Sequence, residues 1–138
     1  NTDEYYKSFN WGYSRNKYAL MESTRGCPYS CTYCHVIFGK KTRYRTPESV
    51  INEIKTMIKN QHITDLFFTD DIFNIDKNRA ARIFDLIIAE KIKIRIHFPN
   101  GLRGDIMDEE FIDKMVEAGT ISVAYAFETP SPRIQKYM

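Results

Sequence analysis

The residues with the clearest chemical potential are three cysteines that lie within eight positions of one another. They are Cys27, Cys31 and Cys34, and the 138-residue sequence has no other cysteine. An odd number of cysteines in so short a stretch argues against a disulfide framework and indicates a metal or redox site in a reducing compartment. Thiolates are the ligands of iron–sulfur clusters. Three of them leave one iron of a four-iron cluster without a protein ligand, and a catalytic metal site keeps such an open position.

Two other kinds of site could use the same cysteines. His35 could complete a zinc site, but it is adjacent to Cys34, and neighbours seldom reach one tetrahedral ion without strain. The common zinc spacings instead pair two ligands with two others far along the chain. A plain electron carrier would want a fourth cysteine. We therefore interpret the stretch as the ligands of a [4Fe-4S] cluster. A zinc-stabilised nucleic-acid-binding module and an iron–sulfur carrier or sensor remain the alternatives.

Composition and length indicate one cytoplasmic globular unit. The chain is 43% hydrophobic and 28% charged, and no apolar run approaches the roughly 18 residues of a membrane span. Residues 1–15 lack the apolar stretch of a signal peptide. A net charge of +2 is lower than a nucleic-acid binder usually carries, so nucleic acid is not indicated as a partner. The chain does not begin with Met, and we interpret it as part of a longer protein.

Hydrophobic patterning predicts alternating strands and helices. Short β-branched or aromatic runs predict strands over 18–22, 65–68, 93–97 and 121–127. Three helices are expected between them, with Thr46, Asp76 and Asp108 as their N-caps. This alternation is typical of an α/β fold with a parallel sheet. We expect residues 18–138 to form this core and the aromatic-rich residues 1–17 to be a linker or strap from an upstream part.

The first strand–helix unit is longer than the others because of a loop that contains all three cysteines. The last three predicted strands begin 28 residues apart, whereas the first unit spans 47 residues. The surplus of 19 residues equals the length of segment 23–41. The loop therefore follows the carboxyl end of the first strand, where parallel α/β folds place their chemistry. Polar residues that follow the other strands should converge on it: Thr69, Asp70, Asp71, Asn100, Arg103, Glu128 and Thr129.

The cysteine spacing resembles a known family motif. Cys-x3-Cys-x2-Cys with an aromatic residue, Tyr33, before the last cysteine is the motif of the radical S-adenosylmethionine superfamily. Segments 25–29 (Arg-Gly-Cys-Pro-Tyr), 70–71 (Asp-Asp) and 126–129 (Ala-Phe-Glu-Thr) are similar to the subgroup that carries a cobalamin-binding domain ahead of its barrel. The resemblance implies a partial TIM-type barrel of six strands, here truncated to about four βα units.

The same resemblance implies an activity. A [4Fe-4S] cluster would reductively cleave S-adenosylmethionine, and the resulting 5′-deoxyadenosyl radical would serve hydrogen abstraction or cobalamin-assisted methylation of an unknown substrate. Cobalamin would be held by a domain outside this chain. A tRNA or protein methylthiotransferase of the same superfamily is an alternative. The electron donor would be a protein such as flavodoxin or ferredoxin.

The resemblance also assigns site residues by position. Tyr33 corresponds to a residue that lies along the cofactor adenine. Thr69, Asp70 and Asp71 stand where a Gly-Gly-Glu-like motif binds the amino group, and an acidic side chain suits an ammonium donor. The glycines of that motif are replaced here, so the backbone is less free to approach a ligand. A simpler interpretation of Asp70 is that it caps the turn after its strand.

Two further residues are expected on the cofactor. Glu128 stands where a polar group bonds the ribose hydroxyls, and Arg103 could pair with the cofactor carboxylate through two parallel hydrogen bonds. Relatives tend to have glycine at the positions of Ala126 and Pro130. The simpler interpretations are a solvated Arg103 and a Glu128 that pairs with a core lysine or arginine.

Two surfaces complete the sequence-based expectations. A basic run of Lys40, Lys41, Arg43 and Arg45 is either a solvated face or a docking site for an acidic electron donor. A helix should begin near Ser131, after the fourth strand. With four strands of six, that strand would leave an apolar edge, and such edges invite pairing with another chain.

Overall fold

Four short strands form the parallel sheet that carries the site. The computed structural model describes residues 17–34 and 37–137. The sheet order is β1 (Tyr18–Met21), β4 (Asp65–Phe68), β5 (Arg95–Phe98) and β6 (Thr120–Val123), and every neighbouring pair is parallel. The predicted α/β class is therefore confirmed. The fourth strand is shorter than predicted: it ends at Val123 because the chain beyond it leaves the sheet, and Phe127 is 89% exposed.

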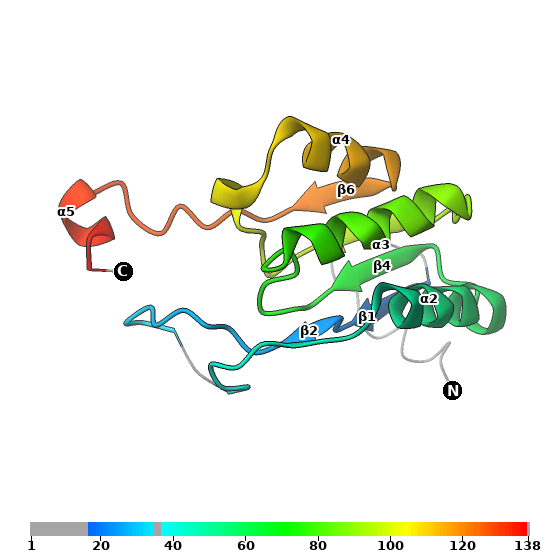
Figure 1. Cartoon of the computed structure of the whole chain (residues 1–138), viewed down its shortest axis with the longest axis horizontal. Helices are drawn as coiled ribbons and strands as arrows, with labels where there is room; N and C mark the ends of the chain where they lie inside the picture. The colour runs from blue at the N-terminus through cyan, green and yellow to red at the C-terminus, as the bar shows by residue number, and fades with distance from the viewer. Residues whose placement is uncertain (1–16, 35–36, 138) are drawn as a thin grey trace.

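Helices cover one face of this sheet, as Figure 1 shows. They are α2 (Pro47–Gln61), α3 (Lys77–Ala89) and α4 (Glu109–Glu117), with a 3-10 turn η1 at Gly104–Ile106 and a short helix α5 at Pro132–Gln135. The side chains of Thr46, Asp76 and Asp108 each accept a hydrogen bond from the backbone N–H three residues on. All three predicted N-caps are thus confirmed.

The two faces of the sheet bury different kinds of residue. Leu66 and Phe68 of β4 pack in the apolar core with Ile83 and Phe84 of α3. Because side chains alternate along a strand, Asp65 and Phe67 face the other side. There the Phe67 ring stacks on His97 at a centroid distance of 4.2 Å. The face opposite the helices is therefore aromatic and polar.

A two-stranded ribbon that the sequence did not predict closes the neck of the cysteine loop. Strands β2 (Thr24–Arg25) and β3 (Arg43–Tyr44) pair antiparallel. Gly26 follows with φ +94°, and a Cβ built there would lie 2.5 Å from the carbonyl oxygen of Lys41. A side chain at position 26 would both clash and strain the backbone, so glycine is required at this crossing. Two-residue strands have no periodicity to detect, which explains why the pattern missed them.

Three further expectations concern membrane spans and the two ends of the chain. No helix in the described residues is both long enough and apolar enough to cross a membrane. Residues 1–16 lie outside the described residues, so the linker or strap predicted over 1–17 stays a prediction. The helix expected near Ser131 is present as α5.

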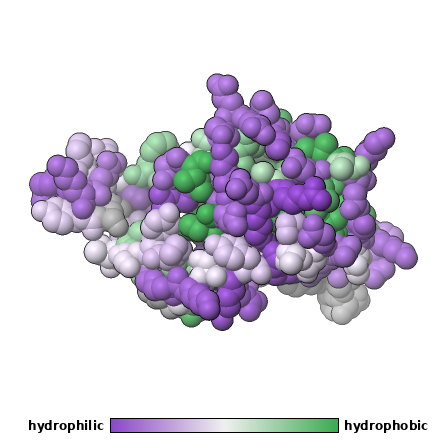
Figure 2. All heavy atoms as spheres, viewed as in Figure 1, coloured by the Kyte–Doolittle hydropathy of each residue, from purple (hydrophilic) through white to green (hydrophobic). Residues whose placement is uncertain are grey.

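The outer edge of β6 pairs with no other strand of the described sheet. Ile121 and the neighbouring Val116 of α4 are 58% and 62% exposed, and hydrophobic residues interrupt a mostly hydrophilic surface near these two elements (Figure 2). We expect the 138-residue chain to self-associate along this edge, and Ile121→Lys to shift it toward monomer. Light scattering over a concentration series measures this, with Ile134→Lys on α5 as control. A parent chain that stays monomeric throughout would contradict it.

Candidate functional site

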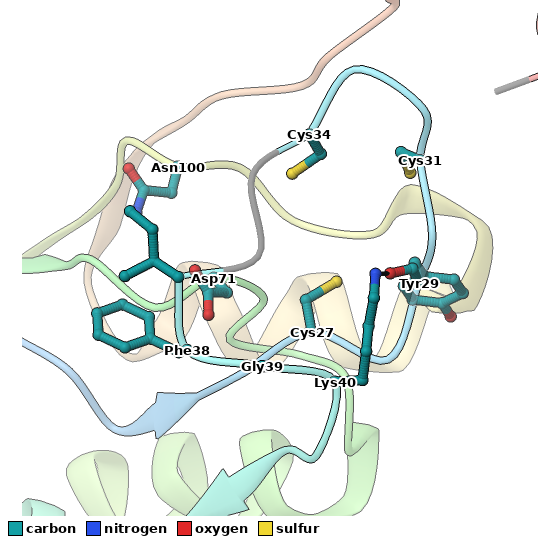
Figure 3. A pocket seen from close by; sticks show the side chains of 10 residues that line it. Cys27, Tyr29, Cys31, Cys34, Phe38, Gly39, Lys40, Asp71 and Asn100 are labelled. Carbon is teal, nitrogen blue, oxygen red and sulfur yellow. Dashed lines mark hydrogen bonds between the residues drawn. The ribbon is translucent and has the colours of Figure 1, made fainter.

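The three cysteines line one cavity at the carboxyl end of the sheet. Cys27 and Cys31 are half-buried and Cys34 is exposed, and all three carry free thiols. They surround a cavity of about 310 Å³, into which Asp71 and Asn100 also project from neighbouring loops (Figure 3). The Cys27 N–H donates to the carbonyl oxygen of Gly39 at 3.2 Å, which holds the two arms of the loop together. The loop that the sequence predicted after the first strand therefore forms much of the lining of a cavity.

The separation of the three thiols bears on the kind of metal group that they could hold. Within the described part of the chain, no three Cys, His, Asp or Glu side chains lie close enough to hold one metal ion. A tetrahedral zinc would draw its sulfurs to about 2.3 Å from one centre. In a four-iron cluster, by contrast, each thiolate binds a different iron, so the sulfurs stand further apart. His35, the fourth ligand of the zinc alternative, lies outside the described residues.

Asp70 fastens the end of β4 to the start of the cysteine loop. It is 2% exposed, and its Oδ1 accepts hydrogen bonds from Ser23 N (3.0 Å), Ser23 Oγ (2.7 Å) and Thr24 N. Burial raises the pKa of Asp70, and the hydrogen bonds from Ser23 and Thr24 partly oppose that rise. Asp70 does not line either of the cavities formed by the cysteine loop. The acceptor role of Asp70 is therefore structural, but it serves residues 46 and 47 positions away and not the turn after its own strand, as the simpler interpretation expected.

Arg79 reinforces the same junction, and sequence reasoning missed it. Its Nε donates to the carbonyl oxygen of Arg45 and its Nη2 to that of Ser23, both at 2.8 Å. The guanidinium also lies over the ring of Tyr44 at 5.7 Å. Burial lowers the pKa of Arg79. The available signal was an arginine on the apolar face of a helix, next to Ala80.

A second, larger cavity joins the cysteine loop to the loops that follow β4, β5 and β6. Its volume is about 540 Å³. Strand ends converge here because the carboxyl ends of parallel strands meet at one edge, visible in Figure 1 on the side of the cysteine loop. Among the predicted site residues, the lining includes all three cysteines, Tyr33, Asp71, Arg103 and Glu128. Thr69 is set back, with its N–H bonded to the carbonyl oxygen of Met21 at 2.9 Å.

Asp71 and Arg103 stand on different walls of this larger cavity. One carboxylate oxygen of Asp71 accepts a hydrogen bond from Gly26 N at 2.9 Å. The Arg103 guanidinium lies over the Tyr29 ring at 4.3 Å and pairs with both carboxylate oxygens of Asp105. This pairing raises the pKa of Arg103 and lowers that of Asp105. The guanidinium of Arg103 is therefore fixed by Tyr29 and Asp105 and does not extend freely into solvent.

Tyr33 and Glu128 meet where the cysteine loop approaches the segment after β6. Loss of hydration and a hydrogen bond with Glu128 raise the pKa of Tyr33 to about 12. Glu128 has φ 55°, in the left-handed region that residues other than glycine seldom adopt. Such backbone strain is found at sites where the surrounding structure holds a side chain for function.

Comparisons with known proteins identify the family of this chain. A family model described as the radical SAM superfamily matches residues 21–138. The chain is 30% identical over 123 residues to an uncharacterised methyltransferase of Pyrococcus horikoshii, covering 88% of this chain and 26% of that protein. It is 28% identical over 118 residues to the cytidylyl-2-hydroxyethylphosphonate methyltransferase of Streptomyces wedmorensis, covering 84% of this chain and 22% of that protein.

Solved structures share the fold. The radical S-adenosylmethionine methyltransferase TsrM of Kitasatospora setae, with tryptophan and a cofactor analogue bound, aligns with a TM-score of 0.80 and 23% identity over 96% of this chain and 24% of that one. TsrM with cobalamin and a [4Fe-4S] cluster bound aligns at 0.72 and 24%, over 87% and 21%. The chain thus spans about a quarter of the length of the proteins it matches. The family match over residues 21–138 and the three-cysteine loop establish that this chain belongs to the radical SAM superfamily.

Proposed function

We propose that this chain is the cluster- and cofactor-binding part of a radical SAM methyltransferase. Cys27, Cys31 and Cys34 would hold a [4Fe-4S] cluster, and S-adenosylmethionine would occupy the cavity of about 540 Å³ beside it. The observation that carries the proposal is that this one cavity is lined by the cysteines and by charged groups of both signs. When bound, the cluster supplies the electron that cleaves the sulfonium of the cofactor.

The chain's own residues would orient the cofactor. One carboxylate oxygen of Asp71 accepts the hydrogen bond from Gly26 N–H, and the second oxygen would accept from the ammonium group of the cofactor. Arg103 would share its charge between Asp105 and the cofactor carboxylate, and the Tyr29 ring beneath it fixes the plane of the guanidinium. Glu128 would accept from the ribose hydroxyls, and Tyr33 would lie along the adenine. Thr69 and Asp70 would support this wall through the backbone.

The relatives favour methylation over direct hydrogen abstraction as the reaction. Two are methyltransferases, and the structural neighbour TsrM was solved with cobalamin bound. We infer that cobalamin is held by a domain outside this chain and that the substrate is a small molecule. A methylthiotransferase of the same superfamily remains the second candidate, because a putative methylthiotransferase of Methanocaldococcus jannaschii is 30% identical to this chain.

The electron donor is proposed to be an acidic protein such as flavodoxin or ferredoxin. Lys40, Lys41 and Arg43 are exposed on the arm of the loop that carries Gly39. Lys40 donates to the carbonyl oxygen of Tyr29, which places its charge beside the cysteine cavity. A positive surface next to the cluster would steer an acidic donor toward it.

Three free thiols and an oxidant-sensitive cluster favour the cytoplasm as the location of this protein.

Cofactor binding tests the proposed roles of Asp71 and Glu128. Asp71→Asn keeps an acceptor for Gly26 N–H but removes the negative charge. Glu128→Gln likewise keeps an acceptor oxygen and removes the charge at the other wall. Each variant should bind S-adenosylmethionine about tenfold to a hundredfold more weakly, with unchanged iron content, because one charge-assisted hydrogen bond is lost. Titration of the reduced cluster followed by electron paramagnetic resonance measures this. Asp113→Asn on the exposed face of α4 is the matched control. Two variants that bind like the parent would overturn these assignments.

A further inference from the structure

Two asparagines join the loops after β4 and β5 in a reciprocal way. Asn74, from the loop after β4, is fully buried; its Nδ2 donates to the carbonyl oxygen of Arg103 at 2.9 Å, and its Oδ1 accepts from Arg103 N at 3.0 Å. Asn100, from the loop after β5, donates from Nδ2 to the carbonyl oxygens of Thr69 (2.9 Å) and Asp70 (3.2 Å). Each loop therefore holds the backbone of the other, and Asn100 and Arg103 both line the larger cavity.

These contacts determine how the Asn100 amide is turned. An amide nitrogen has two hydrogens, and here both point at backbone carbonyl oxygens. The reversed amide would place its oxygen against two other oxygens, so that orientation is excluded. The Oδ1 atom must therefore face away from these carbonyls. None of the described residues donates a hydrogen bond to it, and Asn100 lines both cavities, beside Asp71 and the cysteines (Figure 3).

We propose that Asn100 is a cofactor-contacting residue whose Oδ1 accepts a hydrogen bond from the ammonium group of S-adenosylmethionine. Asp71 and Asn100 line the same cavity, and an ammonium group has three hydrogens to donate. Asn74 is then the positioning residue that keeps the segment of Arg103 at a set distance from Asp71. This inference rests on the proposed cofactor site and adds a neutral acceptor to it, which neither the cysteine motif nor the acidic pair predicted.

The experiment compares two ligands that differ in the group concerned. S-Adenosylmethionine carries the ammonium, whereas 5′-methylthioadenosine has the same nucleoside without the amino-acid part. In the reconstituted protein, Asn100→Ala should weaken binding of S-adenosylmethionine about tenfold to a hundredfold more than it weakens binding of 5′-methylthioadenosine, as measured by equilibrium dialysis. Asn74→Ala should weaken both ligands, because it loosens the wall and not one contact. Asn60→Ala, on the exposed face of α2, is the control and should change neither.

The outcomes separate this inference from the proposed function. If the parent protein with a full cluster binds no S-adenosylmethionine, the proposed function fails first. If the parent binds but Asn100→Ala binds both ligands like the parent, or loses both equally, the ammonium contact is wrong. Asn100→Ser covers the case in which the alanine variant loses its iron: the shorter side chain keeps this position polar but withdraws the amide acceptor. It should show the same loss for S-adenosylmethionine alone.

Discussion

Replacement of any one of Cys27, Cys31 or Cys34 by alanine is expected to abolish the iron–sulfur cluster. Each thiolate would bind its own iron, and two remaining ligands would leave two irons open to solvent and oxidants. After anaerobic reconstitution, the parent should be brown and absorb broadly across the visible range, and each variant should lack that absorption. Iron and acid-labile sulfide analysis supplies the count. Thr32→Ala, an exposed change in the same loop, is the control and should keep the full cluster.

The same measurements decide between iron and zinc. His35→Ala should retain the cluster, whereas a zinc site built from three cysteines and this histidine would lose most of its affinity. A single-cysteine variant that holds a complete cluster would refute the assignment of ligands. Bound zinc without sulfide in the parent would instead favour the binding-module alternative. An iron–sulfur carrier would show the cluster but no spectral response to S-adenosylmethionine.

Asp70→Ala should destabilise the fold, with a loss of about 3 kcal/mol in the free energy of unfolding. The substitution leaves two backbone N–H groups and one hydroxyl buried without their acceptor, and each such group costs about 1–3 kcal/mol. Asp70→Asn keeps an acceptor at Oδ1 and should lose much less. Urea denaturation of the apoprotein measures both variants. If Asp70→Asn is stable but no longer binds S-adenosylmethionine, then Asp70 contacts the cofactor after all.

A pH dependence accompanies this prediction. Because burial raises the pKa of Asp70 above 3.8, the folded state holds that proton more tightly than the unfolded state does. The stability associated with the protonated form is fully present below pH 3.8 and is lost as the pH rises through the folded-state value. Asp70→Asn cannot ionise, so its free energy of unfolding should gain on that of the parent as the pH rises over this window. A constant difference between the two would contradict the raised pKa.

Local sequence was sufficient for most of the elements and for recognising three cysteines that share one cavity. Thr46, Asp76 and Asp108 act through hydrogen bonds three residues away, so their roles can be recognised from the sequence. The same holds for the cysteines, whose short spacing within one loop already limits them to a shared site. The end of β6 was misjudged because apolar residues continue past Val123, although the pairing with β5 does not.

Tertiary structure alone decided the use of each polar residue at the strand ends. Asp70 and Asp71 are adjacent and chemically identical, yet one is buried against Ser23, 47 positions away, and the other lines the cavity. The reason is that successive residues at a strand end point to opposite sides, and only the packed neighbours determine which side is the core. The pairing of Asn74 with Arg103, across 29 positions, depends in the same way on how two loops pack. The sequence by itself therefore determined the family motif and the three cysteines proposed as cluster ligands, whereas the fold determined which other residues line the cavity beside them.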